Sequence, residues 1–135
     1  MNIHVMDANT LLASLRGEPG AEVTNGLLAD PAIDCIAHSV NLCEVYYDSL
    51  RSSDQTAAEK ALAALTALGL SERSDMDQAF WKSIGQLKVS PGKVSLADCF
   101  ALALAIRTGG TLVTSDHHEF DRVVPLGLCP ILFIR

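Results

Sequence analysis

The chain opens with a short apolar stretch that stops at a carboxylate. Residues 3–6 have the composition of a β-strand, and Asp7 ends the run. Leucines at helical spacing follow at once, which predicts a helix over residues 9–15. A strand that leads directly into a helix is typical of open α/β sheets, in which ligands bind beyond the carboxyl ends of the strands. The sequence therefore predicts that Asp7 lies at the edge of a sheet where a site can form.

The rest of the chain alternates between the same two kinds of element. Such alternation predicts an α/β fold, with a mostly parallel sheet of four to five strands flanked by helices on both faces. No linker, internal repeat or low-complexity segment interrupts it, so we expect one domain over residues 1–135. Strands are expected over residues 2–7, 33–36, 70–73, 111–113 and 131–134. Helices are expected over residues 9–15, 19–30, 38–50 and 54–68, then from either Asp75 or Asp77 to residue 87, and over residues 95–106, with a loop over residues 89–94.

The charge balance restricts the classes of partner. The formal net charge is −6, which argues against a nucleic-acid binder that relies on a basic surface. That exclusion is weaker if bound cations neutralise some of the acids. The four cysteines are scattered among apolar neighbours, as expected of small buried hydrophobic residues in a reduced, cytoplasmic protein. No signal peptide or membrane span is recognisable, and the very apolar segment 96–106 is too short to cross a bilayer.

Asp98 is the most informative acid of the chain. It is the only charged side chain from Ser95 to Ile106, and helical spacing places it on one face with Ala101 and Ala105. A buried carboxylate without a partner costs several kcal/mol or takes up a proton. The alternative is an ordinary acid in the first helical turn, three residues after a Ser95 cap.

Two further acids show comparable placement. Glu44 lies in a helical stripe with Val40, Asn41 and Tyr47, although a half-exposed helix glutamate is an equally good interpretation. Asp116 follows the strand at residues 111–113 much as Asp7 follows the first strand, although it could also be a helix cap or turn residue. The case for a site depends on the four acids together.

Four carboxylates in one crevice repel each other, and bound cations make the arrangement tolerable. Oxygen ligands alone select hard ions such as Mg²⁺ or Mn²⁺. Two such ions would change the formal charge from −6 to −2, so that a phosphodiester could approach. Two-metal sites activate a water and stabilise the leaving oxygen of a phosphate, which is nuclease or phosphatase chemistry.

The motifs around these acids resemble a known family. The matching segments cover essentially the whole chain, and they are residues 7–12 (DANTLL), 41–45 (NLCEV), 96–103 (LADCFALA) and 112–116 (LVTSD), followed by Phe120. In this order and spacing they are similar to PIN-domain ribonucleases of the VapC toxin type. The resemblance implies a metal-dependent endoribonuclease that acts on RNA, is held inactive by a cognate antitoxin and forms a homodimer.

The resemblance also implies residue roles. Asp7, Glu44, Asp98 and Asp116 would be the metal-site acids, with Asp7 and Asp98 as direct ligands. Asn9 and Thr114 would orient these carboxylates or the attacking water. Many relatives have Ser where this chain has Asn9.

Two other functions fit parts of the pattern. Haloacid-dehalogenase-like phosphatases also begin with a strand that ends in Asp, but they need a second Asp two residues later, where this chain has Asn9. A catalytically inactive PIN-like domain that only binds RNA or protein is the other alternative. The presence of all four acids argues against it.

Several other polar residues have more than one interpretation. His117 and His118 are adjacent and lack the spacing of a zinc site, so a turn or a substrate contact is favoured for them. Asp121 fits a solvated turn better than a fifth acid. Trp81 with Phe80 fits the core or a dimer interface. Four cations could contact RNA phosphates or simply lie on the surface: Lys82, Lys88, Lys93 and Arg122.

Overall fold

The five strands of the structure run parallel in one sheet, in the order β3–β2–β1–β4–β5. The structure is a computed structural model and describes residues 2–135. The strands are β1 (Asn2–Met6), β2 (Ile33–His38), β3 (Ser71–Arg73), β4 (Thr111–Thr114) and β5 (Ile131–Phe133). The predicted parallel α/β sheet is confirmed.

Helices connect successive strands and cover the sheet. They are α1 (Ala8–Arg16), α2 (Ala21–Ala29), α3 (Ser39–Ser52), α4 (Gln55–Ala67), α5 (Gln78–Leu87), α6 (Leu96–Thr108) and α7 (His117–Phe120), with short helical turns η1 (Lys88–Gly92) and η2 (Val124–Leu126). The prediction of a plain loop over residues 89–94 is wrong, because η1 occupies its first part. The second helix begins at Ala21 rather than Pro19, because Gly20 takes a positive φ of 94° where the chain passes Ile134.

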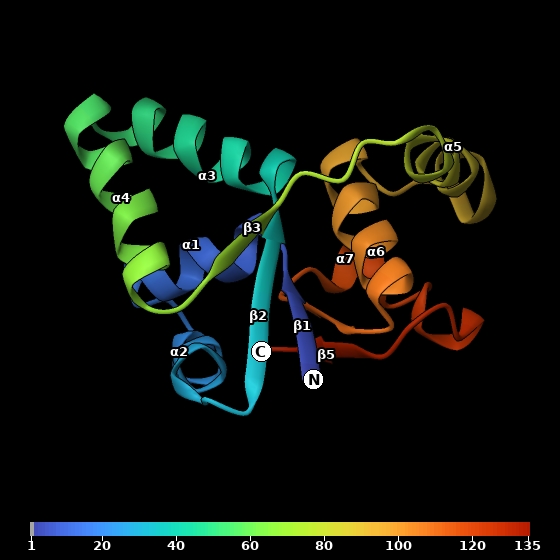
Figure 1. The fold of residues 1–135 in the computed structure, drawn as a ribbon, viewed down its shortest axis with the longest axis horizontal. Helices are drawn as coiled ribbons and strands as arrows, with labels where there is room; N and C mark the ends of the chain where they lie inside the picture. The colour runs from blue at the N-terminus through green and yellow to red at the C-terminus, as the bar shows by residue number, and fades with distance from the viewer. Residues whose placement is uncertain (1) are drawn as a thin grey trace.

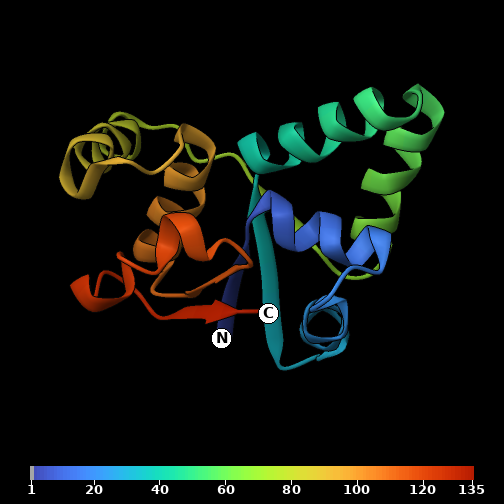
Figure 2. The ribbon, with the colours of Figure 1, turned by 180° about the vertical axis from the view of Figure 1, so that it is seen from behind.

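The sheet separates two hydrophobic cores. Val5 and Ile36 point to the face covered by α5, α6 and α7. Met6 and Ala37 point to the opposite face, which α1 to α4 cover. Side chains alternate in this way because successive residues of a strand project to opposite faces. Figures 1 and 2 show the two groups of helices on either side of the strands. The predicted covering of both faces is therefore confirmed.

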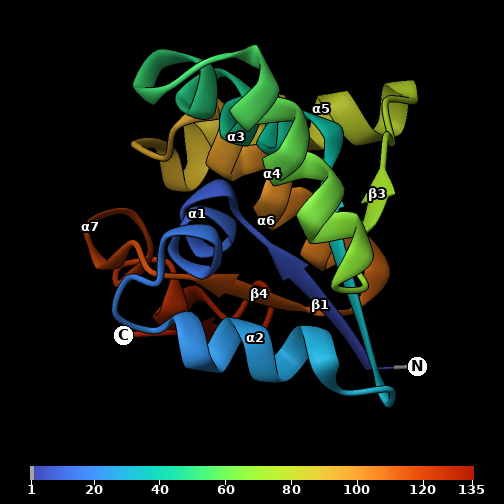
Figure 3. The ribbon, with the colours of Figure 1, turned by 90° about the vertical axis from the view of Figure 1, so that its left-hand side faces the viewer.

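The direction of the strand order reverses at β1. The chain crosses from β1 to β2 and β3 in one direction, and β4 then pairs with the other side of β1, aligning Val113 with Met6. Ligands of open α/β sheets bind at such a reversal, beyond the carboxyl ends of the strands. The carboxyl end of β1 leads directly into α1, as Figure 3 shows. The fold thus places Asp7 and the end of β4 next to each other.

Within residues 2–135, no single helix has the length and hydropathy needed to cross a membrane. The segments Gln78–Gly92 and Leu96–Thr108 meet these criteria only when taken together, and they are bent by 111°.

Candidate metal centre

Asp7 is fully buried at the carboxyl end of β1 and begins α1. Its Oδ1 accepts a hydrogen bond of 2.8 Å from the backbone N–H of Thr10, and its own N–H donates to the Val113 carbonyl at 3.2 Å. Its Oδ2 is buried and has no hydrogen-bond partner among residues 2–135. Burial raises the pKa of Asp7, although Thr114 and Thr10 lower it. A buried oxygen without a donor is available to a cation.

Three other carboxylates converge at this edge of the sheet. Asp98 in the first turn of α6, Asp116 after β4 and Glu119 in α7 each offer an oxygen, and these oxygens lie within 4.8 Å of one another. All three residues are half-buried. Sequence segments that are distant along the chain therefore supply one compact acidic cluster.

The electrostatics of the cluster are those of crowded like charges. Burial raises the pKa of Asp98 to about 9, and a hydrogen bond with Glu119 and the charges of Asp7 and Glu119 add to the shift. The raised pKa favours the protonated form of Asp98, and that proton relieves part of the repulsion. A divalent cation would relieve the same repulsion by replacing that proton.

Glu119 is a member of the site that sequence reasoning missed. Its two carboxylate oxygens accept from the backbone N–H of Ser95 at 3.2 and 3.3 Å, and its own N–H donates to Asp116 Oδ1 at 3.0 Å. The spacing of Asp116 and Glu119 is that of an N-cap residue and the third residue of its helix, and this signal could have revealed both α7 and Glu119.

Glu44 lies outside the group of three, on α3. It is half-buried, and its pKa is raised by burial and then by the charges of Asp7, Asp48 and Glu119. The same helix carries Asn41, whose side-chain amide donates to the Ala97 carbonyl at 3.1 Å and so ties α3 to the start of α6. Glu44 therefore belongs to the electrostatic surroundings of the cluster.

The two predicted orienting residues differ in their surroundings. Thr114 is fully buried, its Oγ1 accepts from the N–H of Asp116 at 3.0 Å, and it lowers the pKa of Asp7. Asn9 is exposed on the first turn of α1. Thr10, which was not singled out, supports Asp7 and also donates from its hydroxyl to the Val113 carbonyl at 3.0 Å.

Of the two adjacent histidines, His117 packs against neighbouring elements and His118 lies on the surface. The ring of His117 contacts Asp121 Oδ1 through Nδ1 at 2.7 Å and the Arg135 carbonyl through Nε2 at 2.7 Å. It also stacks on Phe133, with ring centroids 4.0 Å apart, and so fastens α7 to β5. These hydrogen bonds, the one with Arg135 first, raise the pKa of His117. His118 is exposed.

The aromatic pair on α5 is divided between core and surface. Phe80 is 1% exposed and stacks on the His38 ring, with centroids 5.5 Å apart. Trp81 is 47% exposed. The core interpretation therefore holds for Phe80 alone.

The donor set of the cluster suits a hard divalent ion. Its members are carboxylate oxygens, and Asp7 Oδ2 adds a buried oxygen without a donor. Mg²⁺ and Mn²⁺ prefer such ligands, whereas zinc sites use sulfur and nitrogen ligands more heavily. Asp98, Asp116 and Glu119, together with Asp7, could hold such an ion.

Comparison with solved structures shows the same fold in other proteins. VapBC2 from Rickettsia felis, bound to a DNA fragment from its promoter, matches with a TM-score of 0.74 and 17% identity over 97% of this chain and 98% of that chain. A toxin–antitoxin complex from Klebsiella pneumoniae gives 0.74 and 18% over 98% of each chain. DNA-bound VapBC from Salmonella typhimurium gives 0.69 and 18% over all of both chains. At these identities the likeness establishes the fold.

Sequence comparison gives the family. No curated protein matches the chain significantly. The family model described as PIN domain matches residues 5–124, which include all five acids of the centre. The chain belongs to the PIN domain family.

Proposed function

We propose that this chain is a metal-dependent endoribonuclease that hydrolyses RNA phosphodiester bonds with Mg²⁺ or Mn²⁺. One observation carries the proposal: three carboxylate oxygens within 4.8 Å of one another lie beside a buried aspartate that has an unpartnered oxygen. Structural ion pairs do not explain such a cluster, because none of its acids pairs with Lys or Arg among residues 2–135. Perturbed carboxylates gathered in a crevice are typical of functional sites.

The acids would have distinct duties. Asp98, Asp116 and Glu119 would hold the cation, and the buried Oδ2 of Asp7 would be a further ligand. Glu44 would add negative charge beside these acids and so strengthen cation binding. When bound, the ion supplies the positive charge that activates the attacking water and stabilises the leaving oxygen.

The surrounding polar groups keep these carboxylates in place. Ser95 holds Glu119 through its N–H and caps α6 with its hydroxyl, which accepts from the Asp98 N–H at 3.3 Å. Thr114 fixes the backbone of Asp116. Asn9 is exposed two residues after Asp7, and we propose that it orients the attacking water or the substrate. Such outer groups matter because they set the direction in which a ligand oxygen points.

We further propose that the chain is the toxin of a toxin–antitoxin pair, acts on cytoplasmic RNA, binds a cognate antitoxin and forms a homodimer. Support comes from the full-length likeness to chains in VapBC assemblies and in the Klebsiella pneumoniae toxin–antitoxin complex. Expression of the chain alone should arrest growth of host cells, and expression of the Asp98→Asn variant should not. Equal growth with both proteins would contradict the toxin role.

The decisive experiment is incubation of the purified chain with a mixed RNA pool in Mg²⁺, in Mn²⁺ and in EDTA. We expect internal cleavage that requires the metal and disappears in the Asp98→Asn variant. Single-stranded DNA and a phosphate monoester serve as competing substrates. Cleavage that persists in EDTA, or that is restricted to the monoester, would overturn the proposal. RNA binding without cleavage under every condition would favour the inactive PIN-like alternative.

A further inference from the structure

The positive charges of this acidic chain are unevenly used. Of the ten Lys and Arg side chains, five pair with carboxylates: Arg16, Arg51, Arg73, Arg107 and Arg135. Five have no carboxylate within 4.0 Å in the described chain: Lys60, Lys82, Lys88, Lys93 and Arg122. Three of these five, Lys88, Lys93 and Arg122, lie on the segments that flank Asp98 and Glu119. The free positive charge is thus concentrated beside the acidic centre.

The segment that carries Lys93 is tied directly to two of the acids. Ser95, two residues later, donates its N–H to Glu119 and accepts the N–H of Asp98 on its hydroxyl. The Val94 carbonyl accepts from Lys88 Nζ at 2.7 Å. Since consecutive Cα atoms lie only about 3.8 Å apart, Lys93 is fixed within a short reach of the cluster.

Arg122 is joined to the same segment from the other side. It follows α7, which carries Glu119, and its guanidinium donates to the Lys93 carbonyl. A carbonyl carries no net charge, so the charge of Arg122 stays available. The nearest acid in sequence, Asp121, is engaged by His117.

Lys93 also occupies a backbone conformation that glycine would adopt more easily. Its φ is 58°, and it is the one residue other than glycine with positive φ in residues 2–135. Such conformations cost side-chain-bearing residues free energy, and they concentrate at functional sites. A lysine at a position that favours glycine therefore indicates a functional role for the lysine side chain.

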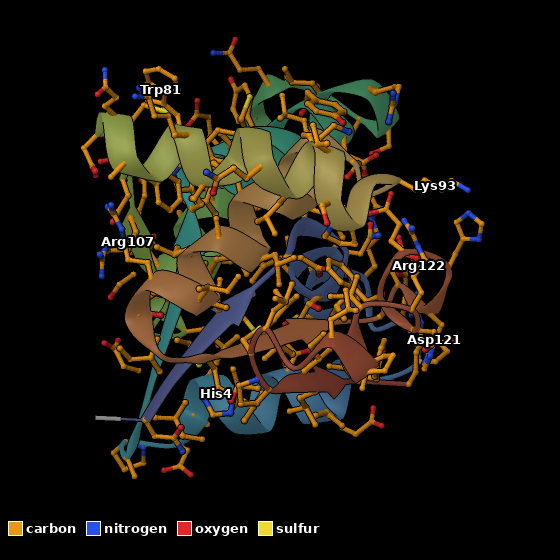
Figure 4. The ribbon with its side chains drawn as sticks, turned by 90° about the vertical axis from the view of Figure 1, so that its right-hand side faces the viewer. His4, Trp81, Lys93, Arg107, Asp121 and Arg122 are labelled. Carbon is orange, nitrogen blue, oxygen red and sulfur yellow. The ribbon has the colours of Figure 1, made fainter. Side chains whose placement is uncertain are left out.

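Figure 4 shows how these cations lie. Lys93 and Arg122 project into solvent side by side, at the end of the domain toward which β1 points. Arg107 and Trp81 lie on the opposite side. Lys82, which is next to Trp81 and 5.9 Å from its ring centroid, therefore lies away from the centre and offers a matched control.

We propose that Lys93 and Arg122 form a phosphate-binding rim that holds the single-stranded RNA next to the scissile bond. This inference rests on the proposed ribonuclease function. A chain of net charge −6 repels a polyanion, so local cations must supply the attraction. The rim lies on one side of the cluster, and therefore it positions the strand on one side of the reacting phosphate. Lys88 supports the rim by holding the Val94 carbonyl.

The test compares charge removal with charge retention. The double variant Lys93→Gln/Arg122→Gln should raise KM for a single-stranded RNA about tenfold while kcat stays within about twofold. Its log kcat/KM should fall less steeply with log salt, by about 1.4 in slope for two phosphate contacts on a single strand. The charge-keeping variant Lys93→Arg/Arg122→Lys should retain the salt slope, and Lys82→Gln should match the wild type. Equal melting temperatures establish that all variants fold.

Binding of a fluorescent single-stranded RNA in EDTA provides a second readout that needs no cleavage. The rim is supported if the Gln double variant binds this RNA more weakly than the wild type and the other variants do not. Suppose that the wild type cleaves RNA and that the Gln double variant has the same KM, salt slope and RNA affinity as the wild type. The proposed rim is then wrong, whereas the proposed nuclease function is retained. If the wild type fails to cleave in Mg²⁺ and in Mn²⁺, the proposed function falls and the rim falls with it. If the Gln double variant keeps RNA binding but loses binding to a partner protein, the cations serve that protein.

Discussion

Two groups of acids lie at opposite ends of α6, and they behave in opposite ways. Near its C-terminal end, Arg107 donates to Asp77 at 2.8 Å and to Asp75 at 3.1 Å, and Arg73 donates to Asp75 at 2.9 Å. The hydrogen bond with Arg107 lowers the pKa of Asp77 to about 2. Near its N-terminal end, burial and acidic neighbours raise the pKa of Asp98 instead.

The difference separates acids that stabilise the fold through ion pairs from the acids that we propose to bind a metal ion. The Asp75–Asp77 group is balanced by two guanidiniums, and the Arg107 guanidinium also lies over the Phe80 ring at 4.9 Å. No Lys or Arg among residues 2–135 forms an ion pair with the Asp98 group, so its repulsion is a cost to folding that a divalent ion would remove. An acid whose pKa is raised beside other acids is therefore the better indicator of function here.

The strongest way to test this comparison is to neutralise one acid in each group. Asp98→Asn should reduce RNA cleavage by about a thousandfold or more, or roughly 4 kcal/mol of transition-state stabilisation. Its metal-free stability should hold or rise, because the change removes like-charge repulsion. Single-turnover rates and thermal melts in EDTA measure the two effects.

The matched variant Asp77→Asn should instead lower stability and leave cleavage unchanged. Asparagine keeps the cap on α5 but loses the charge pair with Arg107, so the melting temperature should fall by a few degrees and cleavage should persist. An Asp98→Asn protein that melts earlier and still cuts RNA would make Asp98 a structural residue.

Glu119→Gln should have the next largest effect. The amide can still accept from the Ser95 N–H, but it binds a divalent ion more weakly than a carboxylate does. We expect cleavage to fall about 10- to 100-fold and the half-saturating Mg²⁺ concentration to rise. Glu22→Gln, at an exposed position on α2, is the control. An unchanged Mg²⁺ dependence would remove Glu119 from the metal centre.

Thr114→Val should show whether orientation of the acids matters. The change leaves the half-buried N–H of Asp116 without its acceptor, at a cost of about 1 kcal/mol in unfolding free energy. It should also slow cleavage about tenfold by releasing Asp116. Thr114→Ser keeps the hydroxyl, so its unfolding free energy and its cleavage rate should be close to those of the wild type. Loss of stability with an unchanged rate would limit Thr114 to a packing role.

The last test concerns pH. The folded pKa of Asp98 exceeds its unfolded value of 3.8 and lies at about 9. Between these values the unfolded chain releases a proton that the folded chain keeps, so the stability of metal-free protein should fall as pH rises. Asp77 has the opposite shift, and its contribution is lost as pH falls from about 4 to 2.

Thermal melts in EDTA between about pH 5 and 8 measure this slope directly. The Asp98→Asn variant should lose most of this dependence of stability on pH. His117, whose pKa is also raised, leaves a smaller slope of the same sign near neutrality. A melting temperature that rises with pH across this range would contradict the raised pKa of Asp98.

Much of the fold follows from local patterns in the sequence. Strands of a parallel sheet are buried on both faces, so β1 and β4 are dense apolar runs that end at polar residues. The helix caps at Asp54, Asp77 and Ser95 are equally local, because each side chain bonds an N–H three residues later. Turns such as η1 and α7 are too short to show a period.

The site was only partly predictable for the same reason. Asp7, Asp98 and Asp116 are marked by the ends of strands and by a lone charge on an apolar helix. Glu119 belongs to a one-turn helix, so no apolar pattern separates it from a loop. Asn9 and Thr10 are adjacent, and a helix turns about 100° per residue. Which of the two faces the acid depends on the packing of α1 against β4, which no local pattern reports.

The pairing of β1 with β4 also governs when this protein can become active during synthesis. Hydrogen bonds from Asp7 and Thr10 reach Val113. β1 can pair with β2 early, but its other side waits for a strand made more than a hundred residues later. Closing so long a loop comes late in folding, and domains emerge from the ribosome N-terminus first. The acids that we propose as the metal site therefore stay apart on the nascent chain until β4 has emerged, which would delay the proposed cleavage of RNA near the ribosome.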